Sequence, residues 1–113
     1  MTHNLPRLSV VVPLYKEEDN VERLIDELQG ALENYPGEFE LVLVDDGSTD
    51  HTRERLLEAR AERGEHLMIL SHRRNLGQTQ AMQTGLLAAR GEVIAFMDGD
   101  LQNDPADLPA MVK

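Results

Sequence analysis

Three side chains with oxygen ligands stand close together after the last apolar run of the chain. Asp98, Asp100 and Gln102 follow the run Val93 to Met97 at intervals of two residues. In an extended segment, residues two apart point to the same side, so the three side chains converge. Carboxylate and amide oxygens suit the hard ions Mg²⁺ or Mn²⁺ better than Zn²⁺. The spacing indicates a candidate metal site, and a solvated acidic turn is the alternative.

A second acidic cluster comes directly after the apolar run Phe39 to Val44. The carboxylates of Asp45 and Asp46 can accept hydrogen bonds from a uracil or guanine N–H or from ribose hydroxyls. The alternative is turn chemistry, with a cap for the following helix. We expect a mixture, in which both aspartates face a ligand and Ser48 to Asp50 start the helix.

Two further polar clusters also follow apolar runs. Tyr15 and Glu17 come just after Pro13, and a tyrosine there can stack on a base, although a surface tyrosine packed on its neighbours is the simpler interpretation. Arg73 and Arg74 suit a diphosphate, and they equally suit a solvated loop. The four histidines show no metal-ligand spacing, and we expect no catalytic role for them.

Apolar runs without polar alternation are separated by segments of helical spacing. The expected strands are 8–14, 39–44, 67–70 and 93–97, and the expected helices run over 18–34, up to 63, from 78 to 90, and from 105. This order predicts an α/β fold, a Rossmann-like parallel sheet with helices on both faces. Ligands bind such sheets beyond the carboxyl ends of the strands, where all four polar clusters fall.

Helical spacing also predicts which side chains face the sheet. We expect Leu56 and Leu57 to point inward from the second helix, and Met82, Leu86 and Ala89 to lie on one face of the third. Gly85 inside the third helix indicates close packing against a strand, and Gly91 is placed to end that helix.

Composition narrows the classes of partner. The chain has 113 residues, 41% of them hydrophobic, and no cysteine, which suits one domain without disulfides or thiolate metal sites. A formal net charge of -10 argues against nucleic acid as a partner, but a metal can still bridge carboxylates to a nucleotide phosphate. The chain shows neither a signal peptide nor a membrane span, so we expect a cytoplasmic protein.

Three segments together resemble a known family. LSVVVPLYKEEDNV, LVLVDDGSTDHT and RNLGQTQAMQTGLLAARGEVIAFMDGDLQNDP are similar to family 2 glycosyltransferases of the GT-A fold, and most similar to polyprenyl-phosphate and dolichol-phosphate sugar transferases. The resemblance spans almost the whole chain. It implies that residues 1–113 form the nucleotide-sugar-binding part of such a domain, truncated after its DxD motif.

The resemblance also implies roles for individual residues. Asp98 and Asp100 fall on the DxD motif, which holds Mg²⁺ or Mn²⁺ against the donor diphosphate, and Gln102 matches a third residue beside the metal. One departure is Lys16, which stands where the family usually has asparagine. The residues implied to bind the nucleotide are Pro13, Tyr15, Glu17, Asp45, Asp46 and Asp98.

The implied reaction is transfer of a sugar, with inversion, from a UDP- or GDP-linked donor to a polyprenyl phosphate or other acceptor. The general base is expected downstream, so no catalytic residue is assigned in this chain, which by itself should bind donor without turnover. If later sequence adds membrane helices, the enzyme would work at the cytoplasmic face of the membrane.

Two alternative functions belong to other classes of protein. One is a catalytically dead nucleotide-binding module, and the other is a signalling receiver domain. A receiver carries its aspartate pair after the first strand, whereas here the pair follows the second. We further expect self-association, because in the family the strand ending at Met97 is flanked by strands from later sequence, and without them it is an apolar edge.

Overall fold

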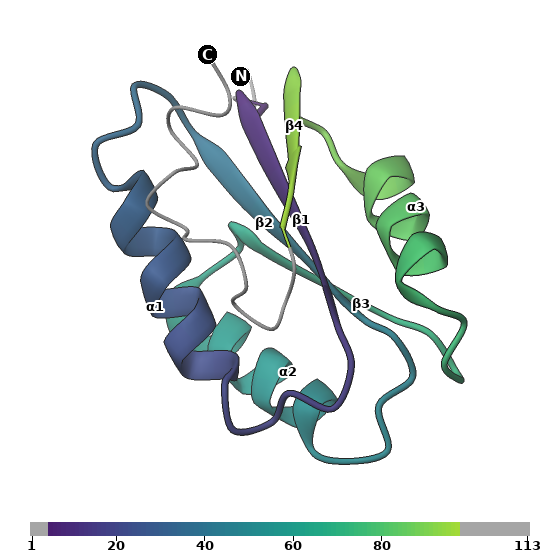
Figure 1. Ribbon diagram of the computed structural model, residues 1–113. Coiled ribbons are helices and arrows are strands. Elements are labelled where there is room, and N and C mark those ends of the chain that lie inside the picture. The colour runs from purple at the N-terminus through teal and green to yellow at the C-terminus, as the bar shows by residue number, and fades with distance from the viewer. Residues whose placement is uncertain (1–4, 98–113) are drawn as a thin grey trace.

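The computed structural model describes residues 5–97, and these form a four-stranded sheet with three helices. Every strand pair is parallel, and the strand order is β3-β2-β1-β4. Helices α1 and α2 lie on one face of the sheet and α3 on the other (Figure 1). The elements are β1 (Leu8–Leu14), α1 (Val21–Leu32), β2 (Phe39–Asp45), α2 (Thr52–Arg63), β3 (Leu67–Ser71), α3 (Gln78–Ala88) and β4 (Val93–Phe96).

This topology confirms the predicted fold class. The order β3-β2-β1-β4 is that of the Rossmann type, whereas a receiver domain needs the order 2-1-3. The described strands agree with the expected ranges to within one residue at each end. Helix α1 is five residues shorter than the expected 18–34 and α3 is two residues shorter than the expected 78–90, and the short helix expected from Pro105 lies outside the described residues.

Two apolar cores of unequal size bury the faces of the sheet. Val10 and Val12 of β1 point toward α1 and α2, and Val11 between them points toward α3, because alternate residues of a strand face opposite sides. This is why β1 is apolar on both faces, with Ser9 as its one polar residue. The larger core takes its helix side chains from Val21, Leu24, Ile25, Leu28, Leu32, Leu56 and Ala59.

Helix α3 approaches the sheet through small residues. Its buried positions are Ala81 and Gly85, one turn apart, and a Cβ added to Gly85 would lie 2.3 Å from Cγ1 of Val11. The expected close packing at Gly85 is therefore confirmed. The expectation for Leu86 was wrong, because the row of small residues faces the strands and turns Leu86 outward, where it is 43% exposed.

Two other details differ from the expected pattern. Leu56 is buried, but Leu57 is 46% exposed, because successive residues of a helix lie about 100° apart around its axis. Helix α3 ends at Ala88, before Gly91. A Cβ at Gly91 would lie 2.7 Å from the backbone nitrogen of Ser9, so this glycine lets the chain pass close to β1 on its way into β4. Within residues 5–97, no helix is long and apolar enough to cross a membrane.

Candidate functional site

Three polar loops gather at the carboxyl ends of the strands, and we call them the carboxyl rim: residues 15–20, 45–51 and 72–77. They follow β1, β2 and β3, and Figure 1 shows that they leave the same end of the sheet. The predicted metal ligands Asp98, Asp100 and Gln102 lie outside the described residues. Within 5–97, no group of three or more acidic or histidine side chains is placed to hold a metal ion.

Asp45 sits where β2 ends beside β1. It pairs in register with Leu14, so it lies next to the start of the loop that carries Tyr15. Its Oδ1 accepts a hydrogen bond from the Ser48 N–H at 3.2 Å, and its backbone carbonyl accepts one from the His72 N–H at 2.9 Å. No described residue donates to Oδ2, and Asp45 as a whole is buried, with 2% of its surface exposed. Asp45 therefore keeps the capacity to accept a hydrogen bond from a ligand.

Asp46 has a different environment. Its Oδ1 accepts from the Leu76 N–H at 2.9 Å and lies 2.8 Å from Nδ1 of His72. Its Oδ2 accepts from the Gly77 N–H at 2.9 Å and from Nδ2 of Asn75 at 3.1 Å. Burial alone raises the pKa of Asp46, but the hydrogen bonds from Leu76, His72 and Gly77 outweigh it and lower that pKa from 3.8. All four donors belong to the loop 72–77. A direct contact between Asp46 and a nucleotide stays a prediction.

The loops 45–51 and 72–77 also touch through their backbones. Gly47 has a φ of 71°, a conformation that favours glycine, and a Cβ there would lie 2.1 Å from the carbonyl carbon of Arg74. The imidazole of His72 reaches on to helix α3, where its Nε2 lies 2.8 Å from Oγ1 of Thr84. Sequence reasoning gave His72 no role, because no spacing rule relates it to Asp46, 26 residues earlier.

The loop 15–20 is held by side chains of the loop after β2. Lys16 has a φ of 54°, and its N–H donates to Oγ of Ser48 at 2.9 Å. The next N–H, that of Glu17, donates to Oγ1 of Thr52 at 2.8 Å. Ser48 and Thr52 therefore fix the path of the loop that presents Tyr15, a role that sequence reasoning did not assign to them.

Tyr15 and Glu17, two of the predicted nucleotide residues, lie on this loop. Tyr15 is exposed, and Nζ of Lys16 lies 5.3 Å from the centroid of its ring. Oε2 of Glu17 accepts a hydrogen bond from Nδ2 of Asn20. Pro13 is buried within β1. The structure thus brings Tyr15, Glu17 and Asp45 to one rim, and their roles toward a nucleotide remain predictions.

Asp50 organises the start of α2. Its Oδ1 accepts hydrogen bonds from both the N–H and the hydroxyl of Thr52, and helix α2 begins at that residue. Burial raises the pKa of Asp50, but these two hydrogen bonds outweigh it and lower the pKa from 3.8. The helix starts slightly later than the expected Ser48 to Asp50, and its N-cap position is His51, which makes no side-chain cap hydrogen bond; Asp50 closes a turn just before the helix.

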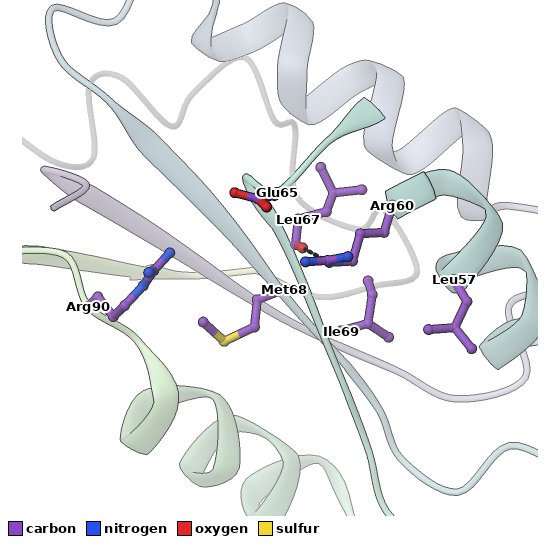
Figure 2. Close-up of a pocket in the computed structure, with 7 residues that line it drawn as sticks. All are labelled: Leu57, Arg60, Glu65, Leu67, Met68, Ile69 and Arg90. Atoms are coloured by element: carbon purple, nitrogen blue, oxygen red, sulfur yellow. Dashed lines mark hydrogen bonds between the residues drawn. The ribbon is translucent and has the colours of Figure 1, made fainter. Parts of the chain in front are cut away.

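A groove of about 520 Å³ lies at the other end of the sheet, along the outer edge of β3 (Figure 2). Its lining residues are Leu57, Arg60, Glu65, Leu67, Met68, Ile69 and Arg90. Nε of Arg60 donates to the Leu67 carbonyl at 3.0 Å and so covers part of the exposed strand edge. None of the predicted site residues lines this groove.

A Rossmann-type sheet with an acceptor-bearing carboxyl rim defines a class of proteins that bind ligands beyond the strand ends. The sequence profile described as "Glycosyl transferase family 2" matches residues 9–113. The chain therefore belongs to glycosyltransferase family 2. This assignment agrees with the resemblance of the three sequence segments.

Two curated relatives are polyprenyl-phosphate sugar transferases. The chain is 50% identical over 105 residues to a dodecaprenyl-phosphate galacturonate synthase of Rhizobium johnstonii, covering 93% of the chain and 31% of the relative. It is 37% identical over 109 residues to an undecaprenyl-phosphate 4-deoxy-4-formamido-L-arabinose transferase of Photorhabdus laumondii, covering 96% and 34%. The chain thus spans about a third of the length of these relatives.

Solved structures confirm the fold. The mannosyltransferase PcManGT of Pyrobaculum calidifontis, in complex with GDP-Man and Mn²⁺, matches with a TM-score of 0.77 and 30% identity over 94% of the chain and 31% of that protein. TarS of S. aureus, residues 1–349 in complex with UDP-GlcNAc, matches with a TM-score of 0.70 and 33% identity over 83% and 26%. The described sheet and helices correspond to the N-terminal part of such GT-A domains.

Proposed function

We propose that the carboxyl rim binds the nucleotide of a UDP- or GDP-linked sugar, in an enzyme that transfers the sugar to a polyprenyl phosphate. The observation that carries this proposal is Asp45, a carboxylate whose Oδ2 has no donor among the described residues and which lies beside the loop of Tyr15. The solved relatives in complex with GDP-Man and UDP-GlcNAc support a nucleotide-sugar donor, and the polyprenyl-phosphate transferases support the acceptor.

Each rim residue has a role that its chemistry allows. Oδ2 of Asp45, which has no donor among the described residues, accepts a hydrogen bond from the base or the ribose, and the ring of the exposed Tyr15 stacks on the base. Pro13, at the end of β1, and Glu17, on the loop that follows, flank the nucleoside, and the resemblance adds Asp98 to this set. The two loops that carry Tyr15 and Asp45 are already braced by Ser48 and Thr52, so little ordering is needed on binding.

A divalent cation belongs to this proposal. Asp98, Asp100 and Gln102 offer oxygen atoms alone, a donor set that fits Mg²⁺ or Mn²⁺, and PcManGT was solved with Mn²⁺. When bound, the ion supplies electrostatic stabilisation of the departing diphosphate. The residues of the carboxyl rim would hold the nucleotide so that its diphosphate faces the ion.

Calorimetric titration with UDP and GDP, each with and without Mn²⁺, tests this proposal. We expect binding of one nucleotide to tighten in Mn²⁺, and Asp45→Asn, Asp98→Ala and Asp100→Ala each to weaken it with the fold intact. Glu62→Ala is the matched control, because it removes an exposed carboxylate near the end of α2, away from the rim. Parental affinity in all three variants would contradict the proposal.

We also propose that residues 1–113 are the donor-binding part of the enzyme and do not transfer sugar by themselves. The chain spans about a third of its curated relatives, and the resemblance implies a general base further along. Incubation with radiolabelled nucleotide-sugars and polyprenyl phosphate should then give no labelled lipid above blank. Donor binding without turnover is also what a catalytically dead binding module would show, and steady turnover by this chain would contradict both.

A further inference from the structure

We propose that Asp46 is a positioning residue, which holds the loop 72–77 in place for nucleotide binding and does not itself contact the nucleotide. This inference rests on the proposed function and gives Asp45 and Asp46 different roles. Asp45 meets the ligand, whereas Asp46 fixes the loop that lies beside Asp45.

The first argument is the hydrogen-bonding capacity of the carboxylate. An ionised carboxylate offers about four acceptor sites, and Asp46 receives two donors on each oxygen. A nucleotide N–H or hydroxyl would have to displace one of these donors, which would then be left without a partner. Such an exchange gains nothing for binding, because each bond formed replaces one that is lost.

The second argument is where the four donors come from. The Leu76 and Gly77 N–H groups stand directly before helix α3, so Asp46 fixes the point at which that helix begins. Backbone N–H groups at a helix start have no partner within the helix, and a carboxylate also suits the positive end of the helix dipole. The start of α3 is therefore attached to the end of β2.

The third argument is a continuous route from Asp46 to Asp45. His72 contacts the carboxylate of Asp46 through Nδ1, and its backbone N–H donates to the Asp45 carbonyl at 2.9 Å. Since a carboxylate only accepts, Nδ1 donates to it, and Nε2 lies 2.8 Å from the Thr84 hydroxyl on α3. The imidazole thus joins the acidic pair to α3, and loss of the Asp46 charge is felt at Asp45.

Amide hydrogen exchange, followed by NMR with and without nucleotide, tests this inference in the parent chain. We expect the Leu76 and Gly77 amides to stay as protected in saturating GDP or UDP with Mn²⁺ as in free protein, because Asp46 keeps both donors. Faster exchange of these two amides on nucleotide addition would mean that Asp46 turns to the ligand, and would overturn the proposal.

Variants give a second readout. Asp46→Asn replaces an acceptor oxygen by an NH₂ group, so we expect about 10- to 100-fold faster exchange at Leu76 or Gly77 and a parallel loss of nucleotide affinity. Asp50→Asn is the matched control, because it weakens a carboxylate contact just before α2 and should leave both amides unchanged. Weaker nucleotide binding by Asp46→Asn with both amides still protected would point to direct contact and contradict positioning.

Thr84→Val keeps the inference testable if Asp46→Asn does not fold. It removes only the hydroxyl at the far end of His72, and we expect a smaller increase in exchange at the His72 amide together with a smaller loss of affinity. Unchanged exchange and affinity would contradict the route through His72. A parent chain that binds neither nucleotide would overturn the proposed function and the nucleotide half of this inference, while exchange in free Asp46→Asn would still decide whether Asp46 holds the loop.

Discussion

Glu40 holds Arg90 at two places, 50 residues further along the chain. The Glu40 side chain is buried within β2, and Oε2 accepts the Arg90 backbone N–H at 2.7 Å. Its Oε1 accepts hydrogen bonds from Nε and Nη2 of the Arg90 guanidinium, at 3.0 and 2.9 Å. The Ser9 hydroxyl donates to the same carboxylate and accepts the Gly91 N–H. This network fixes the entry of the chain into β4, the strand that leads to Asp98.

Arg90→Ala should destabilise the fold by about 2 kcal/mol, measured by urea denaturation. The change removes the guanidinium and leaves the Glu40 carboxylate buried with less compensation, although half of the Arg90 side chain is exposed and the loss falls short of that for a fully buried pair. Arg23→Ala is the control, because its pair with Glu27 is exposed and worth about 0.5 kcal/mol or less. Equal effects of the two substitutions would contradict a structural role for the network.

Gly85→Ala and Gly30→Ala should change stability in opposite directions. At Gly85 the added methyl group would lie 2.3 Å from Val11, so we expect destabilisation by about 1–3 kcal/mol as α3 is pushed from the sheet. At Gly30, within α1, nothing lies within 4 Å, and alanine should stabilise the helix by about 0.5–1 kcal/mol. Thermal unfolding of both variants checks the sign. A neutral Gly85→Ala would mean that α3 is not seated as closely as described.

Stability should fall between pH 7 and pH 5.5, in part because of His66. Burial, and then the charge of Arg63, lower the pKa of His66 from 6.5 in the folded state. The unfolded chain therefore binds the proton first, so the stabilisation is fully present above pH 6.5 and is lost as the pH falls below that value. The pKa values of Asp46 and Asp50 are lowered from 3.8, so their contributions are lost only in more acidic solution.

His66→Gln should flatten the pH dependence of the free energy of unfolding in this window. His51→Gln, at an exposed histidine, serves as the control and should leave the slope nearly as in the parent. If the two variants kept the same slope as the parent, the low pKa of His66 would not be the cause.

The chain should self-associate through β4. Within residues 5–97 this strand pairs only with β1, and Phe96 is partly exposed. Unpaired backbone groups with apolar side chains are a template for another strand, and the net charge of -10 opposes clumping without pairing those groups. Light scattering at micromolar concentration should show a dimer or larger species. A monomer in which the Val93 to Met97 amides exchange slowly would contradict this prediction.

The fold was predictable because β1 and β2 carry apolar residues on both faces and therefore need cover on both sides. Polar residues begin where these strands end, so the rim was also predictable as a location. Helix faces were harder to predict. Leu57 and Leu86 are as apolar as their buried neighbours, but one small residue, Gly85, decides which side of α3 meets the sheet.

The division between Asp45 and Asp46 was not predictable from the sequence. Two adjacent aspartates after a strand look equivalent, and their environments differ only because the loop 72–77 closes onto the second of them. That closure depends on the backbone contact between Gly47 and Arg74 and on the position of His72, neither of which follows from periodicity.

The position of a bound Mn²⁺ ion tests the central claim most directly. In the presence of GDP or UDP, Mn²⁺ should broaden the NMR signals of the Tyr15 and Asp45 amides relative to a Mg²⁺ reference. The amides of Glu38 and His66, which precede β2 and β3 at the opposite end of the sheet roughly 20 Å away, should broaden far less. Broadening that favours Glu38 and His66, or no broadening anywhere at saturating nucleotide, would contradict a metal-dependent nucleotide site at the carboxyl rim.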